Sequence, residues 1–456
     1  MVFSSINFIY FFLPAFLIVY YLVPEKYRNL IIFTGSLIFY GIGSFEHPQN
    51  IFLLLMFIMV NYIAGNMIEK TDKKKLWLAV GLIYDLSMLF FFKYACFIAG
   101  QLSSAELNII LPVGISFYTF QAISYLADIY RKEIRAEKSL VDFGAYLAMF
   151  PQLIAGPIVK YSSIKEALHH RKLSMKLFVS GCRIFILGLG YKVLLANQIG
   201  GLWRQAYMVG FETISVPCAW MSIFAYSFQL YFDFYGYSLM AIGLGKMLSF
   251  RLPVNFKHPY MSTSMTEFFR RWHITLGDWF KNYVYIPLGG NRNGKMRTIL
   301  NLLVVWLLTG IWHGAGYNFV IWGLTVFILI VIEKNGLKKL LDKNKIIGHL
   351  YMLFMIPLMW SIFANTDINQ LITLIKKLFG FIPGNAVIFK EDYIKYLGQY
   401  WWLLLLCTIF STPAPGNLLR KIANSIWELI ILILVFCLVA YCLYKGMDDP
   451  FLYFQF

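Results

Sequence analysis

The chain has 456 residues, of which 59% are hydrophobic and only 14% are charged. Soluble domains carry about a quarter charged residues, so this composition excludes an ordinary soluble protein and indicates a polytopic membrane protein, interpreted as one integral domain over residues 1–456. The net charge of +17 does not predict nucleic-acid binding, because the basic residues cluster in short loops between apolar runs.

Apolar runs recur along the whole chain. A membrane crossing takes roughly 20 residues and several runs are shorter, so we predict about eleven or twelve transmembrane helices, surrounded by membrane lipid, in an all-α fold. The first run lacks the cleavage signal of a secreted leader and is interpreted as an uncleaved span. The runs cover residues 6–23, 29–43, 50–68, 76–100, 109–130, 177–199, 214–239, 298–312, 319–332, 347–364, 400–410 and 426–444.

Basic loops alternate with non-basic loops between the first six runs. Lys and Arg follow the first, third and fifth runs, whereas no Lys or Arg follows the second and fourth. By the positive-inside rule, the N-terminus then faces outward and the lysine-rich loops face the cytoplasm. The residues concerned are Lys26 and Arg28, then Glu46 and His47, then Lys70, Lys73, Lys74 and Lys75, then Glu106, and finally Arg131, Lys132, Arg135 and Lys138.

Two segments break this pattern. Residues 140–159 are apolar but contain FPQLIAGP at 150–157, and two prolines with a glycine argue against a straight span, so a re-entrant element is predicted. Residues 262–290 are only partly apolar and read as amphipathic or re-entrant helices at the cytoplasmic face, beginning with a capping box in Ser264 and Glu267. We expect both segments to border a central cavity.

Histidines at membrane depth are the main candidates for chemistry. His313 ends the apolar run 298–312, roughly 24 Å along a helix from Arg297, and His273 lies in the second broken segment. A buried ionisable group is costly and therefore a functional hypothesis, and neutral imidazole can accept and return a proton. The alternative, a histidine hydrogen-bonded to a neighbouring helix, has equal weight from the residues alone.

Other polar residues carry weaker signals. Asp233 in an apolar run is a candidate substrate contact, although an internal ion pair with a buried Arg or Lys is favoured. Arg270 and Arg271 suit phosphate binding, but ordinary positive-inside placement also explains them. The six cysteines form no C-x-x-C pair, so neither a disulfide framework nor a metal site is predicted.

An ordered set of motifs resembles the membrane-bound O-acyltransferase (MBOAT) superfamily, most closely its alginate O-acetyltransferase type. The matches run nearly from end to end in the expected order. They are MVFSS at 1–5, PVGISFYTFQ at 112–121, FPQLIAGP at 150–157, FDFYGYS at 232–238, FFRRWHIT at 268–275, YIPLGG at 285–290, TGIWHG at 309–314 and PFLYFQF at 450–456.

The resemblance implies an acyltransferase of the bacterial cell membrane. It implies that His313 is catalytic and that His273 lines the same site. The donor would be cytoplasmic acetyl-CoA, with no tightly bound cofactor, and the acceptor an extracytoplasmic polysaccharide, reached through a separate SGNH-type transferase. The acceptor polymer is left open.

The residues suit that chemistry. His313, desolvated and therefore neutral, is a candidate base for the acceptor hydroxyl. Donors from His273, Asn291 or backbone N–H groups near Gly314 are candidates to stabilise the oxyanion, and Trp312 is a further candidate for substrate contact. Arg270 and Arg271 would then meet the CoA phosphates at the cytoplasmic mouth.

Two other functions remain open. Within the superfamily, D-alanyl transfer to teichoic acid from a carrier-protein thioester is the alternative. Outside it, a proton-coupled transporter would use His273, His313 and Asp233 as a relay, although no half-repeat supports this hypothesis.

Overall fold

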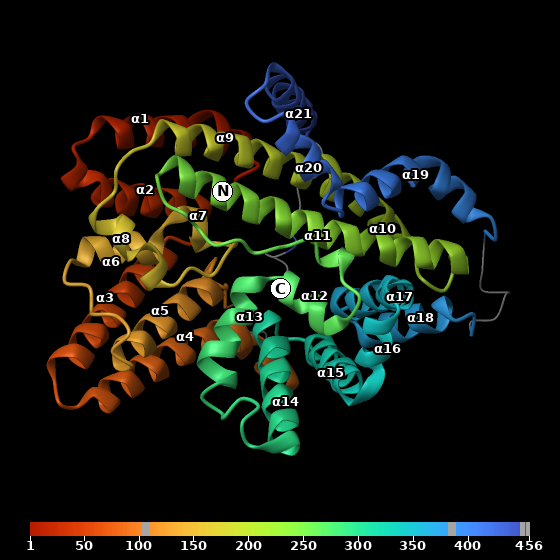
Figure 1. The fold of residues 1–456 in the computed structure, drawn as a ribbon, viewed down its shortest axis with the longest axis horizontal. Coiled ribbons are helices and arrows are strands. Elements are labelled where there is room, and N and C mark those ends of the chain that lie inside the picture. The colour runs from red at the N-terminus through yellow and green to blue at the C-terminus, as the bar shows by residue number, and fades with distance from the viewer. Residues whose placement is uncertain (103–108, 382–388, 447–451, 453–456) are drawn as a thin grey trace. The chain divides into compact units, whose positions relative to one another are not determined.

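The computed structural model describes residues 1–102, 109–381, 389–446 and 452. Glu106 and the C-terminal motif at 450–456, apart from Leu452, lie outside the described residues. Every regular element within the described ranges is helical (Figure 1), so the all-α class is confirmed. The α-helices are α1 (Leu13–Leu22), α2 (Arg28–Gly43), α3 (Gln49–Lys70), α4 (Lys74–Leu102), α5 (Ile115–Tyr130), α6 (Leu140–Ala148), α7 (Phe150–Leu153), α8 (Tyr161–His169), α9 (Met175–Leu189), α10 (Asn197–Val209), α11 (Val216–Met247), α12 (Met265–Arg271), α13 (Ile274–Phe280), α14 (Gly294–His313), α15 (Tyr317–Ile332), α16 (Lys338–Lys343), α17 (Lys345–Ala364), α18 (Ile368–Leu378), α19 (Asp392–Phe410), α20 (Ala414–Lys421) and α21 (Ile426–Tyr444).

Fewer helices than the predicted eleven or twelve are by themselves both long and apolar enough to cross a bilayer. Among the described residues, seven helices are long and apolar enough to cross a bilayer, or eight if the bent pair α19 and α20 forms one span. Several apolar runs give shorter helices: α5 has 16 residues, which rise about 24 Å, less than the roughly 30 Å of a bilayer core. The seven are Gln49–Lys70, Lys74–Leu102, Met175–Val209, Gly294–His313, Tyr317–Lys343, Lys345–Ala364 and Ile426–Tyr444.

The described chain forms two compact units, and the single domain expected over residues 1–456 stays a prediction. Unit 1 comprises residues 1–188, 237–254 and 281–283. In this unit α3, α4 and α5 pack against one another, and α2 packs against α6. Unit 2 comprises residues 189–236, 255–280 and 284–456. In unit 2, α15 packs against α14, α12 and α17.

The first broken segment lies in unit 1, and its interruption is confirmed. α6 ends at Ala148, α7 adds one turn from Phe150, and an irregular stretch follows, all of it buried. Side chains satisfy this buried backbone: Ser36 Oγ accepts from Phe150 N–H (3.0 Å), and Tyr146 Oη donates to the Val159 carbonyl (3.0 Å). Irregular backbone is tolerated at depth only with such partners. On which side the segment enters the membrane stays a prediction.

The second broken segment lies mostly in unit 2 and contains two seven-residue helices, α12 and α13. Ser264 caps α12, because its Oγ accepts from Glu267 N–H (3.2 Å). Glu267 does not close the predicted capping box on Ser264; its carboxylate accepts from Thr263 N–H instead (2.8 Å). The carboxylate of Glu333 also accepts from the first-turn N–H groups of α12, including that of Thr266 (2.9 Å). The negative charge of Glu333 is favourable at the N-terminal end of α12, where the helix dipole is positive.

Candidate active site

His313 lies on a cavity of about 20 Å³ inside unit 2. This volume holds about one water molecule, so a substrate enters only if the surrounding side chains move. Segments that are far apart in sequence supply the lining: α11, α14, α17, the residue that follows α12, and the C-terminal segment. The lining residues are Leu230, Asp233, Phe234, Trp272, His313, Trp360, Phe363 and Leu452.

The imidazole of His313 is half-buried in an aromatic setting at the C-terminal end of α14. The rings of Trp322 and Phe363 approach it edge-on, with centroids at 5.1 and 5.2 Å. The next residue, Gly314, has no room for a side chain, because the Phe319 ring lies 2.1 Å from the position where a Cβ would stand. The His-Gly pair therefore lets the chain leave α14 tightly against its neighbours while the imidazole faces the cavity.

His273 lies between α12 and α13, outside the helices long enough to span the bilayer, and is 3% exposed. Its backbone is left-handed (φ 45°). The centroid of its ring lies 4.8 Å from that of Phe234 and 6.1 Å from that of Trp312. Burial lowers the pKa of the imidazole to about 3, so the ring is neutral. His273 packs behind two residues near the cavity but does not line it.

The rings of Trp312 and His313 also contact each other (4.9 Å). The structure thus brings both histidines and Trp312 into one aromatic cluster, and their roles in catalysis stay predictions. Trp312 is buried within this cluster.

Asp233 forms the internal ion pair that the sequence favoured. Its Oδ1 lies 2.7 Å from Lys192 Nζ, and both side chains are buried. Oδ2 accepts from Leu452 N–H (3.0 Å). Because Asp233 also lines the cavity, a substrate contact stays a prediction beside this structural role.

The remaining candidates, Asn291, Arg270 and Arg271, do not line the cavity that contains His313. Asn291 precedes α14 whereas His313 ends it, and 20 helical residues rise about 30 Å. This separation does not favour an oxyanion-stabilising role of Asn291 at His313, and that role stays a prediction. Arg271 pairs with Glu267, one turn away on α12, and Arg270 is exposed. Their phosphate-binding role stays a prediction.

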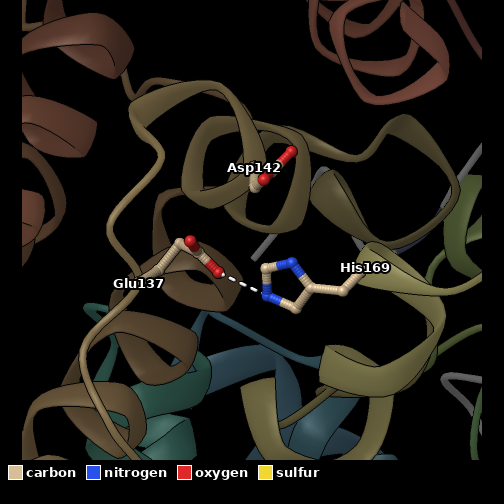
Figure 2. Close-up of side chains that lie close together, drawn as sticks. All are labelled: Glu137, Asp142 and His169. Carbon is tan, nitrogen blue, oxygen red and sulfur yellow. Dashed lines mark ion pairs between the residues drawn. The ribbon is translucent and has the colours of Figure 1, made fainter. Parts of the chain in front are cut away.

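A separate cluster in unit 1 was not predicted from the sequence, because its members come together only in the folded chain. Glu137, Asp142 and His169 place potential ligand atoms within 4.8 Å of one another, as Figure 2 shows. Glu137 accepts from Tyr161 Oη and from His169 Nε2 (2.9 Å) through one oxygen. Its other oxygen accepts from the N–H groups of Lys138 and Ser139. Because donors already surround this carboxylate, we assign the cluster a structural role.

A buried acid within the apolar run 76–100 was also missed. Asp85 on α4 is 0% exposed, and its Oδ1 accepts from Asn61 Nδ2 on α3 (2.7 Å). An acid inside a hydrophobic run is the signal that would have identified it.

Comparison with known proteins identifies a family and several relatives that this chain resembles. The family described as MBOAT, membrane-bound O-acyltransferase, matches residues 8–364. The chain is 41% identical over 348 residues to "Probable alginate O-acetylase AlgI" of Azotobacter vinelandii, covering 73% of this chain and 69% of the relative. It is 34% identical over 467 residues to "Peptidoglycan O-acetyltransferase" of Helicobacter pylori, covering 91% and 86%. It is 28% identical over 252 residues to "Teichoic acid D-alanyltransferase" of Streptococcus thermophilus, covering 51% and 59%.

Proposed function

Because the chain belongs to the membrane-bound O-acyltransferase family, we propose that this multi-pass membrane enzyme O-acetylates a polysaccharide outside the cytoplasm. Relatives named for alginate and for peptidoglycan acetylation support this substrate class, because both polymers present sugar hydroxyls. The relative named for D-alanyl transfer is less similar and covers about half of the chain, which supports the acetyl group over D-alanine.

The observation that carries the proposal is the place of His313, a titratable group on the wall of a cavity lined otherwise mainly by apolar and aromatic side chains. A neutral imidazole here removes the proton from the acceptor hydroxyl, and the oxygen attacks the thioester carbonyl. The C–S bond then breaks, and the proton passes to the departing thiolate. The products are an acetyl ester and a free thiol.

Acetyl-CoA is the proposed donor, arriving from the cytoplasm. Arg270 is better placed than Arg271 to meet its phosphates, because Arg270 is exposed while Arg271 is paired with Glu267. We place the chain in a bacterial cell membrane with its N-terminus outside, in line with the alternating basic loops. A separate SGNH-type transferase outside the membrane would complete delivery to the polymer.

Acetyl-CoA cleavage by the purified protein in lipid nanodiscs tests this proposal. With a hydroxyl acceptor present, the wild type should release CoA, and His313→Ala should release it about 10²–10⁴-fold more slowly. His349→Ala is the matched control, since His349 is exposed on α17 and does not line this cavity. Cleavage of a D-alanyl carrier thioester in place of acetyl-CoA would favour the teichoic-acid alternative. Equal rates in His313→Ala and wild type would overturn the assignment.

A further inference from the structure

The orientation of the Asn255 side-chain amide is fixed by its neighbours. Asn255 Oδ1 lies 3.3 Å from Thr275 N and 3.0 Å from Thr275 Oγ1. A backbone N–H can only donate a hydrogen bond, so the amide atom that faces it is the oxygen rather than the nitrogen. Asn255 is 1% exposed, so water does not compete for this oxygen.

The fixed oxygen in turn determines where the proton of His273 sits. His273 Nδ1 lies 3.2 Å from the same Asn255 Oδ1. An amide oxygen accepts and never donates, so Nδ1 carries the hydrogen. In a neutral imidazole the other nitrogen, Nε2, then bears a lone pair and no hydrogen. Among the hydrogen bonds of the described residues, none reaches this buried Nε2.

The backbone holds the pair in register. The Asn255 carbonyl accepts from Ile274 N–H (3.0 Å), and Lys257 N–H donates to the Arg271 carbonyl (2.9 Å). These two bonds fasten residues 255–257 along residues 271–274, on either side of the left-handed His273. Asn255 therefore restrains His273 through both its main chain and its side chain.

We propose that Asn255 is a positioning residue that fixes the neutral tautomer of His273, with the hydrogen on Nδ1 and a lone pair on Nε2. This inference rests on the proposed function. It also replaces the sequence hypothesis that His273 donates to the oxyanion, because a neutral ring whose Nδ1–H is bound to Asn255 has no second hydrogen to donate. His313 keeps the role of base, and Nε2 of His273 can only accept a hydrogen bond.

The proton position is measurable without any turnover. ¹⁵N spectra of histidine-labelled protein, assigned by comparison with His273→Gln, should show His273 protonated on Nδ1. Asn255→Leu should move the proton to Nε2 and lower the rate of acetyl-CoA cleavage roughly 10–10⁴-fold, the range observed when the partner that sets a histidine tautomer is removed. Asn301→Leu is the matched control: Asn301 is a buried asparagine of unit 2 whose amide nitrogen donates to the Leu288 and Gly290 carbonyls. It should leave the His273 spectrum unchanged.

A conservative variant separates positioning from folding. Asn255→Asp keeps an acceptor oxygen, so it should preserve the Nδ1–H tautomer at neutral pH and most of the activity. The new carboxylate stabilises the imidazolium, so the pKa of His273, followed in the ¹⁵N spectra, should rise by about 1–3 units. The contacts of His273, with Phe234, Trp312 and Asn255, contain no other charge. An Nε2–H tautomer in the wild type, or an unshifted pKa of His273 in a folded Asn255→Asp, would overturn the inference.

The same experiments distinguish a failure of the proposed function from a failure of the positioning role of Asn255. If the wild type cleaves no acetyl-CoA in a His313-dependent manner while its spectrum shows Nδ1–H, the tautomer stands and the assigned reaction falls. If cleavage depends on His313 but Asn255→Leu retains the wild-type rate, the positioning role falls and the reaction stands.

Discussion

Asp233 both lines the cavity and forms a buried ion pair. Its carboxylate lines the cavity that contains His313, yet it already pairs with Lys192 and accepts from Leu452 N–H. A buried pair costs much desolvation, and removal of one partner leaves the other charge uncompensated. The pair therefore stabilises unit 2 chiefly by keeping both charges satisfied.

Asp233→Asn should lower the free energy of unfolding by about 3–5 kcal/mol, because Lys192 is left buried without a counter-charge. The double variant Lys192→Met with Asp233→Leu should recover most of this loss, since apolar side chains of similar volume replace the pair. Denaturation of the detergent-solubilised protein measures both. An Asp233→Asn variant as stable as the wild type would contradict the argument. A stable double variant without activity would show that the pair is needed for the reaction as well as for stability.

The sequence identifies some site residues better than others. His313 and His273 are visible because a histidine beside an apolar run is unusual and costly. Asn255 is not visible, because its contact with His273 exists only after residues 255–257 align with 271–274. Asn291 shows a different limit, because a motif near His313 in the chain is separated from it by the full length of α14.

At the scale of elements, several apolar runs predict the bounds of helices closely. The run 426–444 coincides with α21, and α15 and α17 each begin two residues before their predicted starts. Prolines and glycines also predicted the break between α6 and α7. The partners that make this break tolerable, such as Ser36 on α2, come from distant helices and cannot be read from local sequence.

Close packing of α14 on α15 relies on two glycines that face each other. A Cβ on Gly310 would stand 2.4 Å from the Phe319 carbonyl oxygen, and a Cβ on Gly323 would stand 2.5 Å from that of Trp306. Because the obstructing atoms are backbone, neither can rotate away. Small residues at helix contacts let membrane helices approach in this manner. This contact sets the end of α14, where His313 lies.

Gly310→Ala should destabilise the protein by about 1–3 kcal/mol, because the added methyl forces α14 and α15 apart. It should also slow acetyl-CoA cleavage, since His313 is three residues away. Gly398→Ala on α19 is the matched control: no atom lies within 4 Å of its added Cβ, so higher helix propensity should leave stability unchanged or raise it by up to about 1 kcal/mol. Thermal unfolding in detergent compares the two, and equal midpoints would contradict the packing argument.

At the scale of the whole molecule, composition predicted the class, whereas the number of crossings stays a prediction. Apolar content shows that a segment avoids water, but a helix buried in a membrane protein avoids water whether or not it spans the bilayer. α5 is almost entirely buried within unit 1 and has only 16 residues. α11 has 32 residues but carries polar and aromatic side chains, including Asp233, along a largely buried face. Only tertiary structure distinguishes such helices from lipid-facing spans.

The predicted orientation of the chain can be tested at one candidate crossing, α3. α3 has 22 residues, which rise about 33 Å and suffice to span a bilayer. Glu46 precedes this helix and Lys73 follows it, and both are exposed. The two positions should therefore lie on opposite sides of the membrane, and the positive-inside rule places Lys73 in the cytoplasm.

Single cysteines at Glu46, Lys73, Arg131 and Lys295, in a background with the six native cysteines replaced, test this orientation in intact cells. A membrane-impermeant maleimide should label only the Glu46 position from outside, because basic residues mark the other three as cytoplasmic. Permeabilised cells supply the control, since all four exposed positions should then react. Labelling of Lys73, Arg131 and Lys295 but not Glu46 would invert the orientation. It would also place the proposed acetyl-CoA mouth near Arg270 on the side of the membrane where CoA is absent. Labelling of Glu46 and Lys73 together would show that α3 does not cross.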